Sequence, residues 1–436
     1  MRPRETRAPG KRLSAPVPGQ LRVGLFTDDF YPDSGGVCRS IELQLAELVR
    51  RGYHGTLFSP HVNFTPPPAG DYTTIPTWRV PYSPSYMCSL QFSDALARRI
   101  ARRFTFDVVH SQNERGSMVL AAKIANLQGI PHVHTFHSNY AGTHATTPRQ
   151  AWASSMLFLP LASRVVRRAS ARPLAVSVRR PAPVAGEDSP LAVRDWMNVT
   201  RLAACPDAVT SPAPFLVDTV VRASGGALAG RASVVPSGVS SRFTEVRRRR
   251  PVGAGIRFLS CGRLGAEKRV DAIVRAFALL GRDDAELVIA GGGQEEGALK
   301  QLARTVRHGS VRFTGHIGDV GEVAQTIADA DVFVLASYRF DTQGMVLAES
   351  AAAGTPILYC DDRLSVGVGP DNALLVEPTV EGLAAGMRTL AEDRARLAAM
   401  AEATASLRAG LTTAAMGERY EAIYRAAIAR VGGHTS

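Results

Sequence analysis

The chain has 436 residues, of which 45% are hydrophobic and 21% are charged, which excludes a wholly disordered protein. It holds no run of about 18 consecutive apolar residues, so no membrane-spanning helix is expected. The formal net charge is +12, but only four of the 51 basic residues are lysine, so this arginine-dominated balance does not by itself indicate a nucleic-acid partner.

The first 20 residues are basic and rich in proline, and they lack the apolar segment of a secretory signal. We therefore expect residues 1–20 to be a disordered basic tail and the protein to be cytoplasmic. The five cysteines lie far apart, without the spacing of disulfide pairs or of a zinc site. No metal and no cofactor are expected.

Strand and helix patterns alternate in the first half of the chain. Residues 21–27 form an apolar run, a glycine-rich turn follows, and a helical period ends near residue 52. Further strands are predicted at 106–110, 130–135, 208–210 and 232–235, with a helix at 117–126, whereas residues 169–190 follow no regular pattern. Short apolar strands alternating with helices predict a parallel, doubly wound sheet.

The alternation restarts after four arginines at 247–250, which we expect to form a solvated linker. Strands are predicted at 256–260, 285–290, 311–314, 332–335, 356–359 and 373–376, and helices at 270–280 and 297–306. The sequence therefore predicts an α/β protein in which two Rossmann-like, doubly wound domains, 21–245 and 246–413, face a cleft. Ligands of such sheets bind beyond the carboxyl ends of the strands.

Two loops that follow predicted strands suit phosphate groups. At Gly35 and Gly36, before a helix start, backbone amides can approach a diphosphate, although a tight helix entry would explain the same glycines. The spacing is not Gly-x-Gly-x-x-Gly, so a nicotinamide cofactor is not expected. Arg263 and Lys268 can clamp a phosphate pair from one loop, and a surface salt bridge is the alternative.

A third loop carries two carboxylates eight residues apart. Asp341 is expected in the loop, and Glu349 about one and a half turns inside the helix that follows. The two carboxylates can bind two different groups of one polar ligand. The first amides of that helix, at Gly344, Met345 and Val346, can hold a phosphate or sugar oxygen. A solvated acid and a glutamate on the helix surface are the alternative.

Histidines end two neighbouring strands. His134 and His137 are expected in the cleft, where a neutral imidazole can form a hydrogen bond with a substrate hydroxyl. A metal site is not expected, because it would need a third ligand and the sequence has none nearby. His110 is expected to be structural. Asp329 and Asp331 match an Asp-x-Asp metal pattern, but they enter an apolar strand, so metal binding is not expected there.

Taken together, these loops resemble those of the family 4 glycosyltransferases, which retain anomeric configuration and have the GT-B fold. The resemblance covers nearly all of residues 21–432 and includes the segment Pro236-Ser-Gly-Val239. It implies a transferase with a nucleotide-sugar donor and no required metal. Residues 414–436 look like the C-terminal helix of the family, which returns to the first domain.

The resemblance also implies roles for individual residues. His137 would contact the transferred sugar, Glu349 would hold the ribose hydroxyls, and Asp341 stands where the family normally has glutamate. The implied catalytic residues are His137, Asp341 and Glu349. The implied donor-binding residues are Gly35, Gly36, Arg263, Lys268, Gly344, Met345, Val346 and Glu349.

The acceptor is predicted from the loop that follows His137. This loop lies in the segment 134–144, which together with 341–344 looks like the corresponding segments of two subgroups of the family, the bacterial diacylglycerol glucosyltransferases and the sugar transferases of aminoglycoside assembly. The loop after His137 is the part that bears on the acceptor. Its polar character suits a hydroxyl-rich acceptor, bound by Ser138, Asn139, Tyr140 and His144. We expect transfer of a GlcNAc- or glucose-type hexosyl unit, from a UDP sugar such as UDP-GlcNAc, to a small polar acceptor such as an aminocyclitol in antibiotic biosynthesis.

Two alternatives stay open. A basic amphipathic helix with Arg98, Arg99, Arg102 and Arg103 would suit a glucosyl- or mannosyltransferase in peripheral contact with a membrane, acting on diacylglycerol or another lipid. A GT-B-like epimerase or a sugar-binding protein would share the two domains. No nucleic-acid partner is expected in any of these cases.

Overall fold

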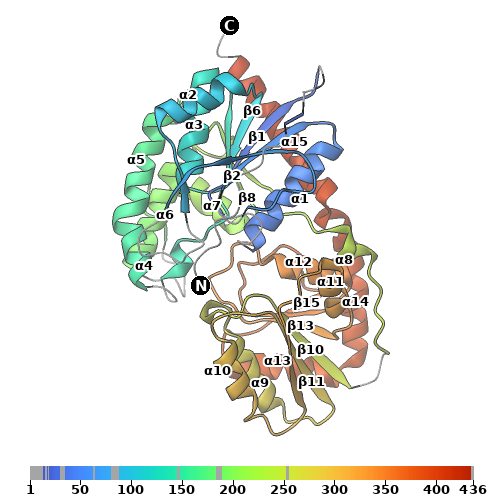
Figure 1. The fold of residues 1–436 in the computed structure, drawn as a ribbon. Helices are drawn as coiled ribbons and strands as arrows, with labels where there is room; N and C mark the ends of the chain where they lie inside the picture. Colours follow the sequence, from blue (N-terminus) through green and yellow to red (C-terminus); the bar gives the residue numbers. More distant parts are fainter. Residues whose placement is uncertain are drawn as a thin grey trace. The chain divides into compact units, whose positions relative to one another are not determined.

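A computed structural model describes residues 13–14, 17, 19–29, 35–61, 64–79, 88–144, 148–182, 189–251 and 255–433. Most of the tail predicted at 1–20 lies outside these residues. The chain forms two compact units: unit 1 comprises Met1–Gly238 and Met416–Ser436, and unit 2 comprises Val239–Ala415 (Figure 1). Each unit has its own parallel sheet, which confirms the predicted α/β class.

The main sheet of unit 1 has seven parallel strands in the order β3-β2-β1-β6-β7-β8-β9. The strands are β1 (Arg22–Phe26), β2 (His54–Pro60), β3 (Asp71–Ile75), β6 (Val108–Ser111), β7 (His132–Thr135), β8 (Ala208–Ser211) and β9 (Ala232–Val234). A separate antiparallel hairpin joins β4 (Thr77–Arg79) to β5 (Cys88–Leu90). The strands β6, β7 and β8 are buried along their whole length, as expected where helices cover both faces of a parallel sheet.

Helices cover both faces of this sheet. They are α1 (Gly36–Arg50), α2 (Asp94–Arg103), α3 (Gly116–Gln128), α4 (Pro148–Ala153), α5 (Leu159–Ala169), α6 (Pro190–Ala203), α7 (Pro214–Ala223) and α15 (Thr413–Gly432). Neighbouring residues of β6 point to opposite faces: Val108 packs with α1 and with Tyr424 of α15, whereas Val109 packs with α2 and α3. No helix in the described part of the chain is long and apolar enough to cross a bilayer.

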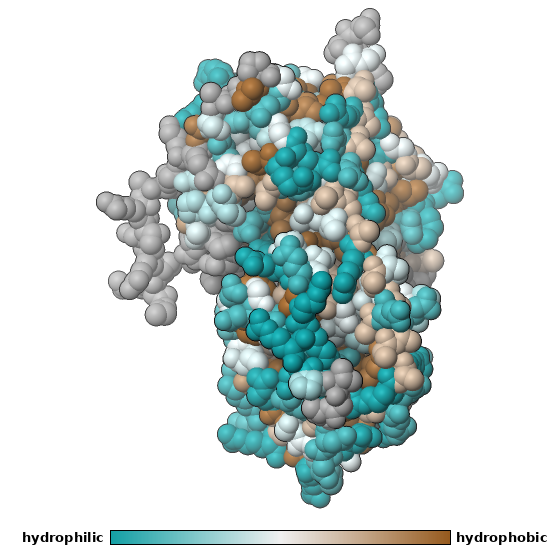
Figure 2. Space-filling model, turned by 90° about the vertical axis from the view of Figure 1, so that its right-hand side faces the viewer, coloured by the Kyte–Doolittle hydropathy of each residue, from teal (hydrophilic) through white to brown (hydrophobic). Residues whose placement is uncertain are grey.

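Unit 2 has six parallel strands in the order β12-β11-β10-β13-β14-β15. They are β10 (Ile256–Cys261), β11 (Ala285–Ala290), β12 (Ser310–Gly315), β13 (Val332–Leu335), β14 (Ile357–Tyr359) and β15 (Ala373–Leu375). The helices are α8 (Ser241–Glu245), α9 (Val270–Leu280), α10 (Glu296–Ala303), α11 (Val320–Ala328), α12 (Met345–Ala353), α13 (Val380–Glu392) and α14 (Arg394–Leu407). The face of unit 2 that is visible in Figure 2 is mainly hydrophilic.

The units divide at Gly238, seven residues before the expected boundary. The difference is α8, whose Phe243 is buried in the core of unit 2. The arginine run after α8 is not the solvated linker that the sequence suggested. Arg248 and Arg250 form ion pairs of 2.7 and 2.6 Å with Asp331, and the backbone amides of Arg249 and Arg250 donate to Asp329. Both aspartates of the Asp-x-Asp pattern therefore hold this arginine segment in place.

Candidate active site

In each unit the parallel strands end at one edge of the sheet, and the predicted site residues lie at these edges. In unit 1, His137 follows β7. In unit 2, Arg263 and Lys268 follow β10, and Asp341 follows β13. Since β6 lies beside β7 and β10 beside β13, loops distant in sequence meet at each edge.

His137 is half-buried, and its Nε2 lies 2.8 Å from the amide oxygen of Gln112. Burial lowers the pKa of His137 to about 4, so the imidazole is neutral near pH 7. An amide oxygen can only accept a hydrogen bond, so the neutral ring carries its proton on Nε2. The other nitrogen, Nδ1, is then a hydrogen-bond acceptor.

A buried chain of amides sets the orientation of Gln112. Gln112 Nε2 donates to Gln44 Oε1 at 2.8 Å, and Gln44 Nε2 donates to the hydroxyl of Tyr424 at 2.9 Å. The same hydroxyl lies 2.8 Å from Nδ1 of His110, which is fully buried and bonded to Thr135 on its other side. His110 thus has the structural role that the sequence predicted. The chain of bonds links the strand-end histidine to α15.

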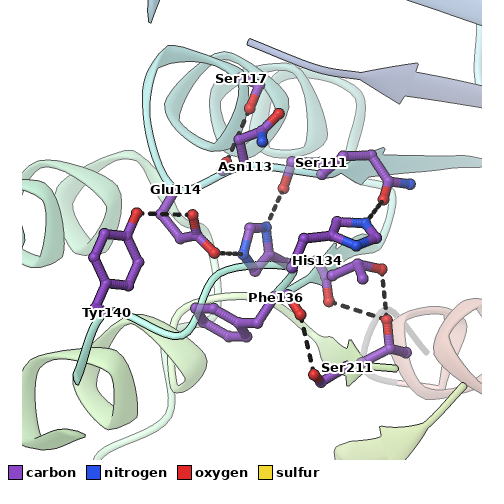
Figure 3. Close-up of polar contacts among 12 residues, drawn as sticks. Ser111, Asn113, Glu114, Ser117, His134, Phe136, Tyr140 and Ser211 are labelled. Carbon is purple, nitrogen blue, oxygen red and sulfur yellow. Dashed lines mark hydrogen bonds and ion pairs between the residues drawn. The ribbon is translucent and has the colours of Figure 1, made fainter. Parts of the chain in front are cut away.

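A second polar cluster surrounds Glu114, which follows β6 and is 2% exposed. Tyr140 donates to one of its carboxylate oxygens at 2.9 Å, and Nε2 of His134 lies 3.8 Å from the other; Figure 3 shows the two rings approaching from opposite sides. His134 is fully buried, and its Nδ1 lies 2.7 Å from the Ser111 hydroxyl. The expectation that His134 lines the cleft was therefore wrong, because its side chain points into the protein.

The loop predicted to bind the acceptor is held largely by internal contacts. Asn139 is buried, and its side-chain oxygen accepts from the Gly142 amide at 3.2 Å. His144 Nε2 lies 2.8 Å from the buried carboxylate of Asp195. Ser138 and Tyr140 are half-buried, and the bond to Glu114 fixes the Tyr140 ring. Three of the four predicted acceptor residues, Asn139, Tyr140 and His144, are thus engaged within unit 1.

Gly35 and Gly36 lie at the amino end of α1, and residues 30–34 before them lie outside the described part of the chain. Gly35 has a φ of 69°, a conformation that glycine adopts at little cost. Among the residues that the structure describes, none has an atom within 4 Å of a Cβ built at this position. The glycine therefore serves the backbone turn.

In unit 2 the structure joins two predicted residues directly. Lys268 Nζ lies 2.5 Å from Asp341 Oδ1, and the Ser337 hydroxyl donates to Oδ2 of the same aspartate. Burial alone would raise the pKa of Asp341, but the charge of Lys268 and the two hydrogen bonds hold it below its usual value. Arg263 forms an ion pair of 2.5 Å with Glu267 and remains mostly exposed. The loop after β10 therefore carries two cations, each paired with a carboxylate: Lys268 is half-buried and Arg263 is mostly exposed.

The helix α12 begins beside this loop. Gly344 has a φ of 67° and precedes Met345, and no side chain in the described part of the chain caps this helix start. Its first amides are thus oriented for an oxyanion. Glu349 is half-buried in the second turn. Burial raises the pKa of Cys261 to about 12, and the nearby carboxylate of Glu349 adds to this rise, which places Glu349 close to the end of β10.

Sequence reasoning missed Gln112 and Glu114, which fix His137 and Tyr140. Both follow a predicted strand directly, so the rule that selected His137 could have found them. Among the described residues, no group of three or more His, Cys, Asp or Glu side chains is placed to hold a metal ion.

Comparison with known proteins gives one family match in each half of the chain. Residues 34–243 match the family described as Glycosyltransferase Family 4, and residues 255–393 match the family described as Glycosyl transferases group 1. The chain is 27% identical over 360 residues to alpha-monoglucosyldiacylglycerol synthase of Streptococcus pneumoniae, covering 78% of this chain and 70% of the relative. It is 26% identical over 348 residues to phosphatidyl-myo-inositol mannosyltransferase of Mycobacterium leprae, covering 78% and 79%.

Solved structures agree on the fold. The chain superposes on Anabaena HepE in complex with UDP with a TM-score of 0.64 at 14% identity, covering 93% of this chain and 100% of that one. It superposes on WaaG, a glycosyltransferase involved in lipopolysaccharide biosynthesis, with a TM-score of 0.60 at 16% identity, covering 91% and 98%. These similarities confirm two parallel-sheet α/β domains of the GT-B type.

Proposed function

We propose a donor and an acceptor for this hexosyltransferase, which belongs to the family 4 glycosyltransferases. The donor is a nucleotide sugar, UDP-linked, and the acceptor is a hydroxyl of a membrane lipid such as a diacylglycerol or a glycolipid. Transfer retains the anomeric configuration. The observation that carries the acceptor is an exposed surface of unit 1 that is both basic and apolar.

We call this surface the α2–α5 face, after the helices that bound it. It combines the exposed arginines of α2 and α5 with large apolar side chains that are 52–63% exposed and lie on α3, on α5 and on the helical turns that lead directly into α5. The arginines are Arg98, Arg99, Arg102, Arg103, Arg164, Arg167 and Arg168. The apolar side chains are Leu127, Trp152, Leu157 and Leu161. The helices α2, α3 and α5 pack side by side (Figure 1), and Arg98, Leu127 and Arg168 line one shallow hollow.

Physical chemistry favours an anionic bilayer as the partner of this face. Cationic side chains are attracted to acidic headgroups, and leucine and tryptophan insert at the boundary with the acyl chains. The abundance of arginine in this chain explains the charge alone, but it does not explain large apolar side chains left in water beside it. The names of the two relatives described above also refer to lipids, diacylglycerol in one and phosphatidylinositol in the other.

The small polar acceptor that the sequence favoured has weaker support. It relied on four residues of the loop after His137. The side chains of Asn139, His144 and Tyr140 already bond to Gly142, Asp195 and Glu114. Of the four residues only Ser138 then remains for an acceptor, so we place the lipid first.

Donor activation follows from the charges at the edge of unit 2. As the bond between the sugar and the phosphate stretches, negative charge grows on the diphosphate. Arg263, Lys268 and the first amides of α12 stabilise this charge, and Glu349 holds the ribose hydroxyls. Preorganised charge of this kind is usually the largest contribution to catalysis. Asp341 accepts from Lys268 and Ser337, so we assign it the role of positioning Lys268.

The transfer step needs no protein nucleophile. The acceptor oxygen forms a bond to the anomeric carbon as the bond to the donor phosphate breaks, and the departing phosphate oxygen takes the proton of the acceptor hydroxyl. We assign His137 the role of contacting the transferred sugar.

The test is co-sedimentation with anionic vesicles, paired with transfer assays on diacylglycerol. Each basic residue near such a surface contributes about 1 kcal/mol, so replacing Arg98, Arg99, Arg102 and Arg103 by Gln should weaken vesicle binding by at least about 100-fold. A matched control removes the same charge from exposed arginines of unit 2, namely Arg304, Arg307, Arg394 and Arg396.

The expected result is salt-sensitive vesicle binding that the control variant keeps and the α2 variant loses, with transfer to diacylglycerol falling in parallel. Turnover of a water-soluble acceptor without vesicles, unchanged in the α2 variant, would instead establish the polar acceptor.

A further inference from the structure

A pocket of about 240 Å³ lies in unit 1, away from the proposed transfer site. Asp207 and Arg231, which line it, directly precede β8 and β9, and Arg430 and Val431 close it from the end of α15. Parallel strands all begin at one edge of their sheet. The pocket therefore lies at the edge opposite to that of His137.

The charges around this pocket do not balance. Asp207 accepts from Arg172 at 3.0 and 3.3 Å and from the backbone amide of His132 at 2.9 Å. Arg430 donates to two backbone carbonyls, those of Asp207 at 2.6 Å and Gly230 at 2.9 Å. The pocket is thus lined by three guanidinium groups, those of Arg172, Arg231 and Arg430, and by one carboxylate, that of Asp207. This carboxylate is already bonded to Arg172.

Arg231 carries the unsatisfied charge. Its Nη1 is buried and has no hydrogen-bond partner among the residues that the structure describes. Burial lowers the pKa of Arg231, Asp207 opposes this shift, and the like charges of Arg430 and Arg172 add to it. A buried donor without an acceptor costs free energy, and an arriving anion would remove this cost.

We infer that this pocket binds a phosphate-class anion, with Arg231 as the direct donor and Arg172 and Arg430 as flanking charges. The planar guanidinium group matches the oxygens of a phosphate. The volume is below the usual range for drug-sized ligands, which suits a phosphate group bearing a few further atoms. The apolar side chains of Leu174 and Val431 in the wall also favour a small ester. This inference rests on contacts within unit 1 alone and does not depend on the acceptor proposed above.

The probes are inorganic phosphate, sn-glycerol 3-phosphate and phosphatidylglycerol vesicles, compared at constant ionic strength. We expect thermal unfolding of the wild type to shift upward and to saturate with at least one of them. Hydrogen bonds to charged groups are strong enough that Arg231→Gln should weaken this binding by about 10- to 100-fold.

Two control variants show whether the shift in thermal unfolding arises from anion binding at this pocket. Arg222→Gln removes the same charge from an exposed position on α7 and should bind like the wild type. Lys268→Ala disables the proposed donor site in unit 2 and should also keep the response.

A measurement without anion separates binding from a structural role. Since Arg231 is a half-buried cation close to two others, with a buried Nη1 that has no partner among the described residues, Arg231→Gln should unfold at the same temperature as the wild type or higher. Response to soluble phosphates assigns a free metabolite, and response to vesicles alone assigns a lipid headgroup; both support the pocket. No response in the wild type, a response that Arg231→Gln retains, or a lower unfolding temperature of Arg231→Gln without anion would overturn the inference.

Discussion

The ion pair between Lys268 and Asp341 offers a sharp test of the proposed chemistry. Its Nζ–Oδ1 distance is 2.5 Å, and the two side chains are 24% and 12% exposed. Lys268→Ala removes a cation from the developing charge on the diphosphate. Loss of one such donor costs about 2.7–4 kcal/mol, so kcat/KM should fall by about 100- to 1000-fold.

Asp341→Asn should have a smaller effect, because Lys268 remains but is no longer held. Exposed ion pairs contribute up to about 1 kcal/mol and hydrogen bonds to charged groups about 1.5–3 kcal/mol. This half-buried pair lies between these cases. We therefore expect a loss of about 1–2 kcal/mol, or about 5- to 30-fold in kcat/KM.

The double variant decides what Asp341 does. If Asp341 acts only by positioning Lys268, then Lys268→Ala with Asp341→Asn should be as active as Lys268→Ala alone. The assay is kcat/KM for transfer, with circular dichroism as the check on folding. Losses that multiply in the double variant would refute the positioning role and would indicate a direct contact between Asp341 and the donor.

Three further outcomes are expected. Glu349→Gln should lower transfer by about 100-fold while remaining folded, and near-normal turnover would remove Glu349 from the site. Transfer should continue in EDTA, and a loss of activity that magnesium or manganese restores would contradict this. Burial lowers the pKa of His132 to about 3, of His137 to about 4, and of His110 well below 6.5. The unfolded chain therefore binds more protons below pH 6.5, so stability should be complete above pH 6.5 and fall toward pH 4 by up to about 1.4 kcal/mol per pH unit for each histidine. His132→Gln should flatten this dependence in thermal unfolding, and an unchanged slope would contradict the assignment.

Much of the fold could be predicted because its signals are local. The helix at 270–280 and the strand at 285–290 have the bounds that hydrophobic periodicity indicates. The strands β2 and β3 were missed: His54–Pro60 and Asp71–Ile75 contain polar residues and a glycine, and their burial depends on pairing with β1 and with each other. A strand stabilised by its neighbours leaves a weak pattern in its own residues.

The candidate site also has features that the sequence could predict and features that it could not. That His137, Arg263 and Lys268 would follow strands could be predicted, because the alternation of strands and helices determines which loops lie at the carboxyl edge. Their partners could not. Lys268 and Asp341 are 73 residues apart in the sequence, and they meet because β10 lies beside β13. Local periodicity determines where a strand ends, whereas the order of strands in a sheet, and with it each side chain's partner, depends on how the whole chain packs.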